Sequence, residues 1–540
     1  MQTKPIQLTN KNRLIRHYRK EREEMMGYFD YKPFDNFQIR LEDLQQRSYH
    51  RDELATTLHN MNENWAAPAS TLQQIERLRD ESSVVVIGGQ QAGLLTGPFY
   101  SINKLISIVR LAKEQEEKLQ RPVIPVFWIA GEDHDFEEIN HIYTTKHQHI
   151  YKHRLNSEMN NKKSVSHLAM DQEAAVTWLQ TAFSYLQETV YTKSLYEKVE
   201  SCLHASHSYV DFFARLIFEL FPDEGIVLVD SGDVAIRRLE NDFFKQLINK
   251  QEEISTSVYE TVQKLQQEGY PIPLEVELDD AHLFYHDEYN ERILLKREDD
   301  LWIGKNDEVE LTTTEMLSFA ENNPDRLSNN VVTRPLVQEF LFPTLAFVGG
   351  DGEISYWAAL KQAFHHVGFK MPPVLPRISF TYQTDRISKL LRTRVLDAND
   401  VIENGLDEIR MNWLLNQETP SIERLFREAH VKIEQIHSPL SDVAKEISPD
   451  LEAEARRNQD YIKGNIDYLQ RKMEQKLAEK YEHQLLQFDE ITNALKPNAT
   501  LQERIWSPLP FVNEYGVQFL RLLMNDDHLS MKQTHYLVTL

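Results

Sequence analysis

The sequence contains a single cysteine, Cys202, in 540 residues. One thiol cannot form an internal disulfide, and it cannot supply a metal site built from several cysteine ligands. Hydrophobic runs are also short, and none approaches the roughly 18 apolar residues of a membrane span. The N-terminal residues lack the apolar core of a signal peptide. These absences predict a cytoplasmic protein that does not enter a membrane.

Basic residues are fewer than acidic residues. The chain has 60 lysines and arginines against 84 aspartates and glutamates, which gives a net charge of -24. Such an acidic surface argues against broad nucleic-acid binding, although a local basic pocket can still bind a phosphate or a carboxylate. The 41% hydrophobic content is ordinary for a globular protein, and the length allows roughly three domains.

The clearest structural signal lies between residues 81 and 140. Val84 to Ile87 form a β-branched apolar run, a helical spacing follows at 103–113, and a second apolar run spans 123–130. This order predicts two parallel strands joined by a helix. Three later segments repeat the pattern of a buried strand before a turn: 225–233, 345–348 and 373–380. We therefore predict an α/β fold with a parallel-sheet core assembled from separated segments.

Periodicity and composition divide the chain into successive segments. They are 1–80, an N-terminal helical extension; 81–140, the first part of the core; 141–224, a mostly helical insertion; 225–234, a core strand; 235–325, a second insertion of helices and an antiparallel patch; 326–384, the second part of the core; 385–500, a helical domain; and 501–540, a C-terminal segment packed on the core.

The first candidate loop is GGQQAGLLTGP, which follows the strand at Val84. Its backbone N–H groups at the start of a helix could hold an anionic ligand. The spacing matches neither the GxGxxG nor the Walker A motif, and a tight turn without a ligand explains the glycines equally well. The candidate binding residues are Gly88, Gly89, Gln90, Gln91, Gly93, Thr96 and Gly97.

The second candidate loop is GEDHDFEE, after the second strand. We take Asp133, His134 and Asp135 as candidate catalytic residues, with Trp128 and Glu132 beside them. Such a cluster can hold Mg²⁺ or an ammonium group, or let the histidine act as acid or base. The alternative is a helix N-terminus that attracts carboxylates, which explains the two following glutamates better than it explains these three residues.

The third candidate group combines TRPLVQEF with the glycine-rich GGDGEISYW. Arg334 could pair with a carboxylate or phosphate of a ligand, or form an internal salt bridge. Because loops after parallel strands meet at one edge of a sheet, all three groups should surround one pocket. The third group comprises Arg334, Gly350, Asp351, Glu353, Tyr356 and Arg377.

Residues 385–500 are charged, poor in glycine and helical in pattern. Ile462, Ile466, Leu469 and Met473 follow a 4, 3, 4 spacing that is typical of a coiled coil. We expect an antiparallel coiled-coil hairpin that forms a homodimer.

Four quoted stretches, GGQQAGLLTGPFY, FWIAGEDHDFEEIN, SNNVVTRPLVQEFLFPTLAFVGGDGEISYW and FKMPPVLPR, resemble the BshC family of bacillithiol biosynthesis cysteine-adding enzymes. The resemblance runs the length of the chain. It implies a Rossmann-like, nucleotidyltransferase-type core with connecting-peptide insertions and a coiled-coil domain used for dimerisation. The implied activity is a ligase that joins L-cysteine to glucosaminyl-malate, the last step of bacillithiol synthesis.

The resemblance also suggests how the carboxylate of cysteine is activated. A nucleotidyltransferase-like core implies ATP with Mg²⁺ and a cysteinyl-adenylate, as in the analogous mycothiol ligase. This chain contains neither a HIGH nor a KMSKS sequence. With adenylation, the loop from Gly88 to Gly97 would contact phosphates, and His134 would stabilise the transition state.

Two rival functions remain open at the level of sequence. One is a metal-dependent hydrolase built on Asp133, His134 and Asp135. The other is a non-catalytic coiled-coil scaffold with a degenerate nucleotide-binding core. Polar residues in three separate loops after strands favour an enzyme over the scaffold.

Overall fold

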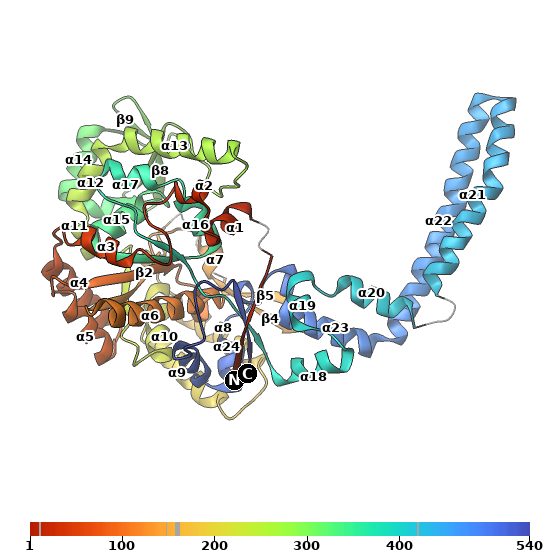
Figure 1. Cartoon of the computed structure of the whole chain (residues 1–540), viewed down its shortest axis with the longest axis horizontal. Helices are drawn as coiled ribbons and strands as arrows, with labels where there is room; N and C mark the ends of the chain where they lie inside the picture. The colour runs from red at the N-terminus through yellow and green to blue at the C-terminus, as the bar shows by residue number, and fades with distance from the viewer. Residues whose placement is uncertain (10–11, 147, 157–162, 418–420) are drawn as a thin grey trace. The chain divides into compact units, whose positions relative to one another are not determined.

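The computed structural model describes residues 1–9, 12–146, 148–156, 163–417 and 421–540 (Figure 1). The chain forms two compact units. The first unit contains residues 1–146, 150–382 and 502–540, and the second contains 147–149 and 383–501.

A five-stranded sheet forms the centre of the first unit. Its order is β13-β12-β2-β3-β6, and every pairing in it is parallel. In this order the chain adds strands outward from β2 to β6 and then returns to the other side of β2. The topological switch point therefore lies between β2 and β12, where such folds bind ligands. The strands are β2 (Val84–Gln90), β3 (Val123–Ile129), β6 (Val227–Asp230), β12 (Thr344–Gly349) and β13 (Val374–Pro376).

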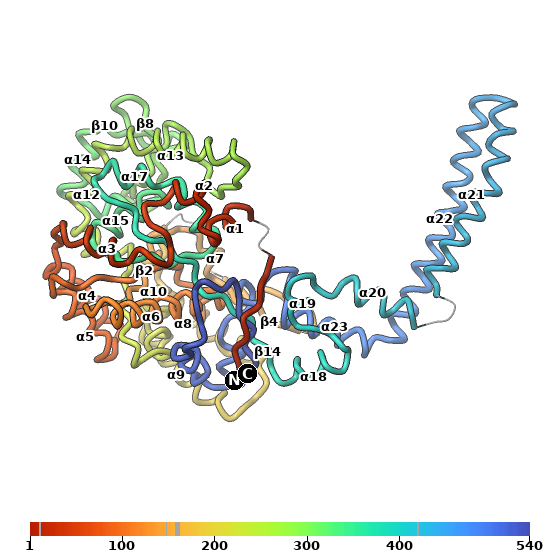
Figure 2. Tube along the Cα trace, in the orientation of Figure 1, coloured from red at the N-terminus to blue at the C-terminus, as the bar shows by residue number. Residues whose placement is uncertain are grey.

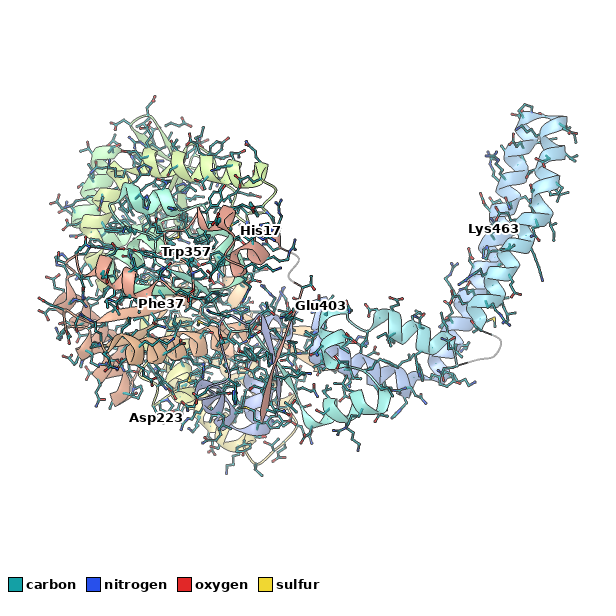
Figure 3. The ribbon with its side chains drawn as sticks, viewed as in Figure 1. His17, Phe37, Asp223, Trp357, Glu403 and Lys463 are labelled. Carbon is teal, nitrogen blue, oxygen red and sulfur yellow. The ribbon has the colours of Figure 1, made fainter. Side chains whose placement is uncertain are left out.

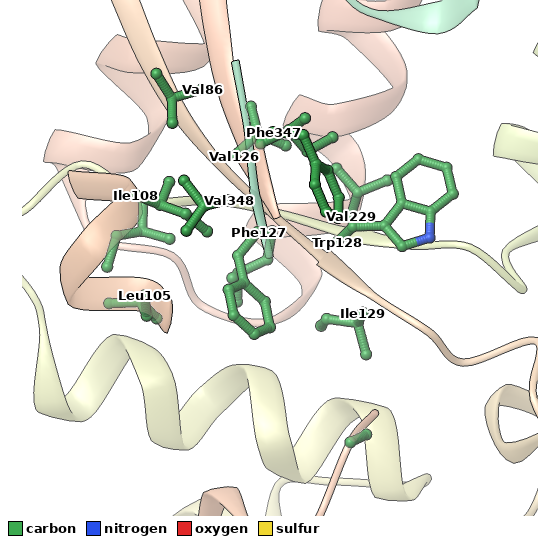
Figure 4. Packing of buried hydrophobic residues seen from close by; sticks show 14 of the residues in the cluster. Val86, Leu105, Ile108, Val126, Phe127, Trp128, Ile129, Val229, Phe347 and Val348 are labelled. Carbon is green, nitrogen blue, oxygen red and sulfur yellow. The ribbon is translucent and has the colours of Figure 1, made fainter. Parts of the chain in front are cut away.

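The core of this unit is built on both faces of the sheet. Every residue of β3 is buried, as its continuous apolar sequence predicts for a strand covered on both sides. Figure 4 shows Val348 of β12 close to Ile108 of α6, and Val126 of β3 close to Phe347 on the other face of the sheet. Burial of each such side chain contributes about 1.5–3 kcal/mol, which makes the sheet a rigid support for the loops that follow it.

The strand expected at 373–380 is shorter than predicted, and this expectation needs correction. β13 ends at Pro376, and Phe380 begins a different strand, β14 (Phe380–Gln383). The chain leaves the parallel sheet because the N–H of Ile378 donates to Ser107 Oγ at 2.8 Å instead of to a neighbouring strand. Arg377 therefore lies in a connection between two sheets.

The two ends of the chain meet in a three-stranded sheet of order β1-β15-β14 (Figure 2). β1 (Gln2–Ile6) pairs antiparallel with β15 (His535–Thr539). The N-terminal segment, expected to be helical, thus starts with a strand. Antiparallel pairing also joins the patch expected in the second insertion, in the order β10-β9-β8-β7-β11. Its strands are β7 (Asp280–His286), β8 (Arg292–Glu298), β9 (Leu301–Gly304), β10 (Glu310–Thr312) and β11 (Leu327–Asn329).

Helices surround these sheets, and α6 packs on β2, β3 and β12. A pair of short strands, β4 (His141–Lys146) and β5 (His149–Arg154), follows α7. Among the described residues, no helix is both long enough and apolar enough to cross a membrane. The helices of the first unit are α1 (Arg13–Arg19), α2 (Glu23–Met26), α3 (Phe37–Leu44), α4 (Arg51–Asn64), α5 (Ala69–Arg77), α6 (Tyr100–Leu119), α7 (Phe136–Ile139), α8 (Gln172–Ser184), α9 (Thr192–His204), α10 (Tyr209–Leu220), α11 (Val234–Leu239), α12 (Asn241–Asn249), α13 (Gln251–Gln267), α14 (Thr313–Asn322), α15 (Thr333–Leu341), α16 (Asp351–Trp357), α17 (Lys361–His366), α24 (Leu509–Tyr515) and α25 (Gln518–Met524).

The second unit is helical, and its two longest helices, α21 and α22, lie side by side (Figure 3). Ser448 separates them, and its hydroxyl caps α22. His430 contacts Asp467 at 2.8 Å, and Lys463, labelled in Figure 3, lies 3.9 Å from Glu434. The helices are α18 (Asp385–Arg394), α19 (Ala398–Asn404), α20 (Asp407–Leu415), α21 (Ile422–Ile447), α22 (Pro449–Lys480) and α23 (Glu482–Leu495).

Candidate active site

A cavity of about 810 Å³ in the first unit contacts the loops that follow β2, β3 and β12. It therefore lies at the switch point of the sheet, at the carboxyl ends of the strands. Most predicted site residues line it: Gly89, Gln90, Gln91, Trp128, Asp133, Asp135, Arg334, Gly350, Asp351, Glu353, Tyr356 and Arg377. The predicted residues outside its lining are Gly88, Gly93, Thr96, Gly97, Glu132 and His134.

Gly88 and Gly89, expected in the first loop, lie within strand β2, and packing requires glycine at both positions. A Cβ on Gly88 would lie 2.6 Å from the carbonyl oxygen of Val348, and one on Gly89 would lie 2.5 Å from that of Trp128. Neighbouring strands approach so closely that no other residue fits there. Gly97 has a φ of +68°, which favours glycine for conformational reasons.

The backbone N–H groups of this loop do not all face the cavity. Gly93 donates to the carbonyl oxygen of Gln91 at 3.0 Å, and Gly97 donates to that of Leu94 at 2.9 Å. These donors are therefore used inside the loop and do not fit the predicted phosphate contacts. Thr96 is buried and borders a separate apolar groove instead.

Lys104, on α6, joins the first and third loops beneath the cavity. Its side chain is 1% exposed and forms an ion pair with Glu353, with 2.5 Å between Nζ and Oε2. Burial lowers the pKa of Lys104, whereas Glu353 favours the charged form. The same Glu353 oxygen accepts a hydrogen bond from the N–H of Gly350 at 2.8 Å, which caps α16. Sequence reasoning missed Lys104, because a lysine in an amphipathic helix is normally exposed.

Arg334 bridges two consecutive carboxylates of the second loop. Its Nε donates to Glu132 Oε1 at 2.7 Å, and its Nη2 donates to Asp133 Oδ1. The side chain of Asn330 accepts from the N–H groups of residues 332 and 333, so it caps α15 and sets the position of Arg334. Arg334 thus forms the internal salt bridges expected as one alternative. It also lines the cavity, and its pairing with a ligand stays a prediction.

Glu132 is the buried centre of a network of charges below the second loop. Burial opposes its ionisation, but the guanidinium groups of Arg237, Arg334 and Arg292 hold the pKa of Glu132 at about 2. Glu240, the second carboxylate bound to Arg237, has its pKa raised to about 7, chiefly by burial. Glu132 is thus a buried structural anion that ion-pairs with Arg237 and with Arg334, of which Arg334 lines the cavity.

His134 does not line the cavity, and Arg292 Nη1 contacts both His134 and Asp133. The ring of His134 faces Phe284 of β7, with 6.2 Å between ring centroids, and its Nδ1 lies 3.5 Å from Arg292 Nη1. Asp133 and Asp135 line the cavity instead. Asp133 is ion-paired with Arg292 at 3.3 Å as well as with Arg334. Its charge is therefore largely neutralised by protein groups.

Three further cationic side chains line the cavity. Arg377 lines the cavity and forms a two-point ion pair with Glu503, which raises its pKa although burial opposes this. Arg504 is exposed, lines the same cavity and has no ion-pair partner among the described residues. Lys152 also lines it, with Nζ 5.6 Å from the centre of the Tyr143 ring. Neither Arg504 nor Lys152 follows a core strand, so the strand-and-loop pattern could not identify them.

Buried aromatic and amide side chains complete the lining. Trp128 is 1% exposed, and its indole N–H has no hydrogen-bond partner within the part of the chain that the structure describes. Gln338 is buried one helical turn after Arg334 and lines the cavity on the same face of α15. Unpaired buried donors are uncommon, and a ligand that supplies acceptor oxygens would satisfy them.

Asp133, His134 and Asp135, predicted as a possible metal-binding cluster, are not grouped as metal ligands in the described part of the chain. Over the described ranges, no three His, Cys, Asp or Glu side chains are close enough together to hold a metal ion. Asp133 is ion-paired with Arg292 and Arg334, and His134 Nδ1 also lies beside Arg292 Nη1, so both donors face protein cations that would repel a metal ion. This geometry does not favour the metal-dependent hydrolase.

Comparison with known proteins covers the whole chain. A family model described as "Bacillithiol biosynthesis BshC, N-terminal Rossmann-like domain" matches residues 1–378, and one described as "Bacillithiol biosynthesis BshC, C-terminal coiled-coil domain" matches 380–540. The prediction of a Rossmann-like core is thereby confirmed. A solved structure titled as an arginyl tRNA synthetase from Campylobacter jejuni has 10% identity and a TM-score of only 0.23, covering 87% of this chain and 97% of that one.

Curated relatives agree with the family models. A protein from Oceanobacillus iheyensis is 41% identical over 544 residues, which cover 100% of both chains. Proteins from Bacillus thuringiensis subsp. konkukian and Bacillus anthracis are each 39% identical over 528 residues, covering 98% of both chains. All three are named "Putative cysteine ligase BshC". On these matches, the chain belongs to the BshC family.

Proposed function

We propose that this chain is a ligase that joins the carboxyl group of L-cysteine to the amino group of glucosaminyl-malate, forming the amide of bacillithiol. The names of the family and of its curated relatives support the reaction class. The single structural observation that carries the proposal is the cavity at the switch point, which presents charges of both signs. A purely structural scaffold would have no need for such a polar cavity at the ends of the strands.

The charges of the cavity suit both substrates. Cysteine carries one amino group and one carboxylate, and glucosaminyl-malate carries one amino group and two carboxylates. Asp135 and Asp351 line the cavity and could bind an ammonium group, while Lys152 could bind a carboxylate. Opposed charges of this kind would orient the amino nucleophile toward the cysteine carboxyl group, which lowers the entropic barrier to amide formation.

Amide formation from a carboxylate requires that one carboxylate oxygen be converted into a leaving group. We propose that ATP with Mg²⁺ provides this activation in a nucleotidyltransferase-type core. Arg504 and Arg377 are the cationic side chains of the lining that would hold the phosphates. The 3-2-1-4-5 order of the parallel strands supports this type of core. Gly93 and Gly97 are not assigned to the phosphates, because both N–H groups are used inside their loop.

The decisive experiment is a reconstituted reaction. Purified protein is incubated with L-cysteine and glucosaminyl-malate, with and without ATP and Mg²⁺, and the thiol product is measured by mass spectrometry. We expect product only when ATP is present. Product without ATP would refute the activation step alone. Absence of product under every condition, with both substrates shown to be intact, would refute the ligase.

A further inference from the structure

The ammonium group of Lys104 is fully occupied by protein acceptors. Its Nζ lies 2.5 Å from the carbonyl oxygen of Gly89, 3.2 Å from Gln90 Oε1 and 2.5 Å from Glu353 Oε2. An ammonium group has three donors, and these three contacts use them all. Lys104 therefore cannot bind substrate without giving up one of these bonds. Its effect on a ligand must pass through the groups that it holds.

These contacts bridge the switch point of the sheet. Gly89 and Gln90 end β2, whereas Glu353 lies in the first turn of α16, after β12. The Lys104–Glu353 ion pair thus fixes the first and third loops of the site relative to each other.

Lys104 also determines which way the side-chain amide of Gln90 points. An ammonium group can only donate, so the atom of Gln90 that faces it must be the oxygen. The amide nitrogen, Nε2, is then directed away from the lysine. Gln90 lines the cavity, and its Nε2 has no hydrogen-bond partner among the residues that the structure describes. The result is an oriented donor at the point where ligands bind in such folds.

We propose that Lys104 is a positioning residue that orients Gln90, and that Gln90 Nε2 donates a hydrogen bond to an acceptor oxygen of the bound glucosaminyl-malate. The choice of ligand rests on the proposed function. A free amide can rotate and present either its donor or its acceptor, whereas an amide held by a lysine presents only its donor. Without Lys104, the site would lose the donor for part of the time and would bind the ligand less tightly.

The test is a double-mutant cycle of Gln90→Leu, Lys104→Met and the double variant. Gln90→Leu keeps the Lys104–Glu353 ion pair, so it should fold. We expect each single variant to raise the Kd for glucosaminyl-malate, measured by calorimetry, by roughly ten- to a hundredfold. Both substitutions act on the same hydrogen bond. The Kd of the double variant should therefore be no more than about threefold higher than that of the single variant that binds less tightly.

Matched controls separate positioning from folding. Lys113→Met removes a lysine from the same helix that is ion-paired with Glu224, outside the cavity lining, and should leave the Kd unchanged. Gln90→Glu should also weaken binding, because a carboxylate would pair with Lys104 and offer no donor. Melting temperatures identify variants that fail to fold. A purely structural Lys104 would lower the melting temperature while leaving the Kd of the folded fraction unchanged.

Three outcomes would overturn the inference: a wild-type Kd in Gln90→Leu, a wild-type Kd in folded Lys104→Met, or losses that add up in the double variant. Binding without product formation in the wild-type protein would count against the proposed ligase but leave the cycle interpretable. If wild-type protein does not bind glucosaminyl-malate, the ligand named by the inference is wrong. The binding measurement thus distinguishes the two failures.

Discussion

Arg377 and Glu503 form a two-point ion pair between the core and the C-terminal segment. Nη1 lies 2.7 Å from Oε2, and Nη2 lies 2.6 Å from Oε1. Glu503 Oε2 also accepts from Asn103 Nδ2 of α6 at 2.6 Å. These contacts tie the C-terminal segment to the cavity, where Arg504 follows directly in sequence. The placement of a candidate ligand-binding arginine therefore depends on a neighbouring buried carboxylate.

The first prediction concerns Glu503→Gln. This variant removes the ion-pair partner of buried Arg377, and loss of one partner of a buried ion pair typically costs about 3–5 kcal/mol of unfolding free energy. Urea unfolding at pH 7 measures the effect, with the exposed Glu514→Gln as the control. A change below about 1 kcal/mol would show that the pair contributes little to stability.

Glu503 also predicts how stability depends on acid. Burial raises its pKa, but Arg377 outweighs this effect, and the pKa of Glu503 is about 2 in the folded protein. A depressed pKa stabilises the fold above the unfolded value of roughly 4.3, and this stabilisation is lost as pH falls toward 2. The wild-type protein should therefore lose more stability than Glu503→Gln between pH 4.5 and pH 2. Parallel curves would contradict the assignment.

Asp230 predicts a change in a different pH range. Burial raises the pKa of this carboxyl group to about 7, although Gly232 N–H and Ser166 Oγ donate to it. A raised pKa means that its contribution is fully present below about pH 4 and is lost as pH rises through 7. The wild-type protein should lose up to about 4 kcal/mol of unfolding free energy as this group ionises, and Asp230→Asn should not show this loss. Urea unfolding of both proteins from pH 4 to pH 8 measures this change. A difference in unfolding free energy that stays constant over the range would contradict the prediction.

Arg334→Lys tests whether the bridge between Glu132 and Asp133 matters for catalysis. A lysine has one ammonium group and cannot reproduce the two directed contacts of a guanidinium. We expect kcat/KM to fall at least about tenfold, because Asp133 would no longer be held at the cavity. Arg238→Lys, an exposed change on α11, serves as the control. Equal kcat/KM in both variants would show that any positive charge at position 334 is sufficient.

Substitutions of His134 test whether its ring stabilises the transition state. His134→Ala should lower product formation at least about a hundredfold if the ring donates a hydrogen bond to developing charge, and His134→Asn should keep part of the activity. Equal losses would point to acid or base chemistry. Wild-type turnover of the alanine variant would show that the ring only packs against Phe284 and Arg292.

The parts of the fold that follow from local sequence are the βαβ unit and the loops after its strands. A continuous apolar run ended by Gly88 leaves few alternatives to a buried parallel strand, and the cavity lies where such strands end. Lys104 could not be predicted, because its burial depends on Glu353, which lies 249 residues away in sequence. For His134, the sequence predicts the position in the loop. It does not predict the direction of the ring, which packs against Phe284 of β7.

The last prediction is that the protein forms a homodimer through α21 and α22, which we propose to be an antiparallel coiled coil. Several apolar residues of α21 are exposed within this unit, among them Ile436 at 66%, Leu440 at 56% and Ile447 at 69%. A second copy would cover such side chains, and each contributes about 1.5–3 kcal/mol when fully buried. Light scattering across micromolar concentrations should give twice the 63.5 kDa monomer mass. Leu440→Glu with Ile447→Glu should give monomers, because each would bury a charge, whereas the exposed control Lys445→Glu should remain dimeric. A wild-type mass of 63.5 kDa at every concentration would refute the dimer.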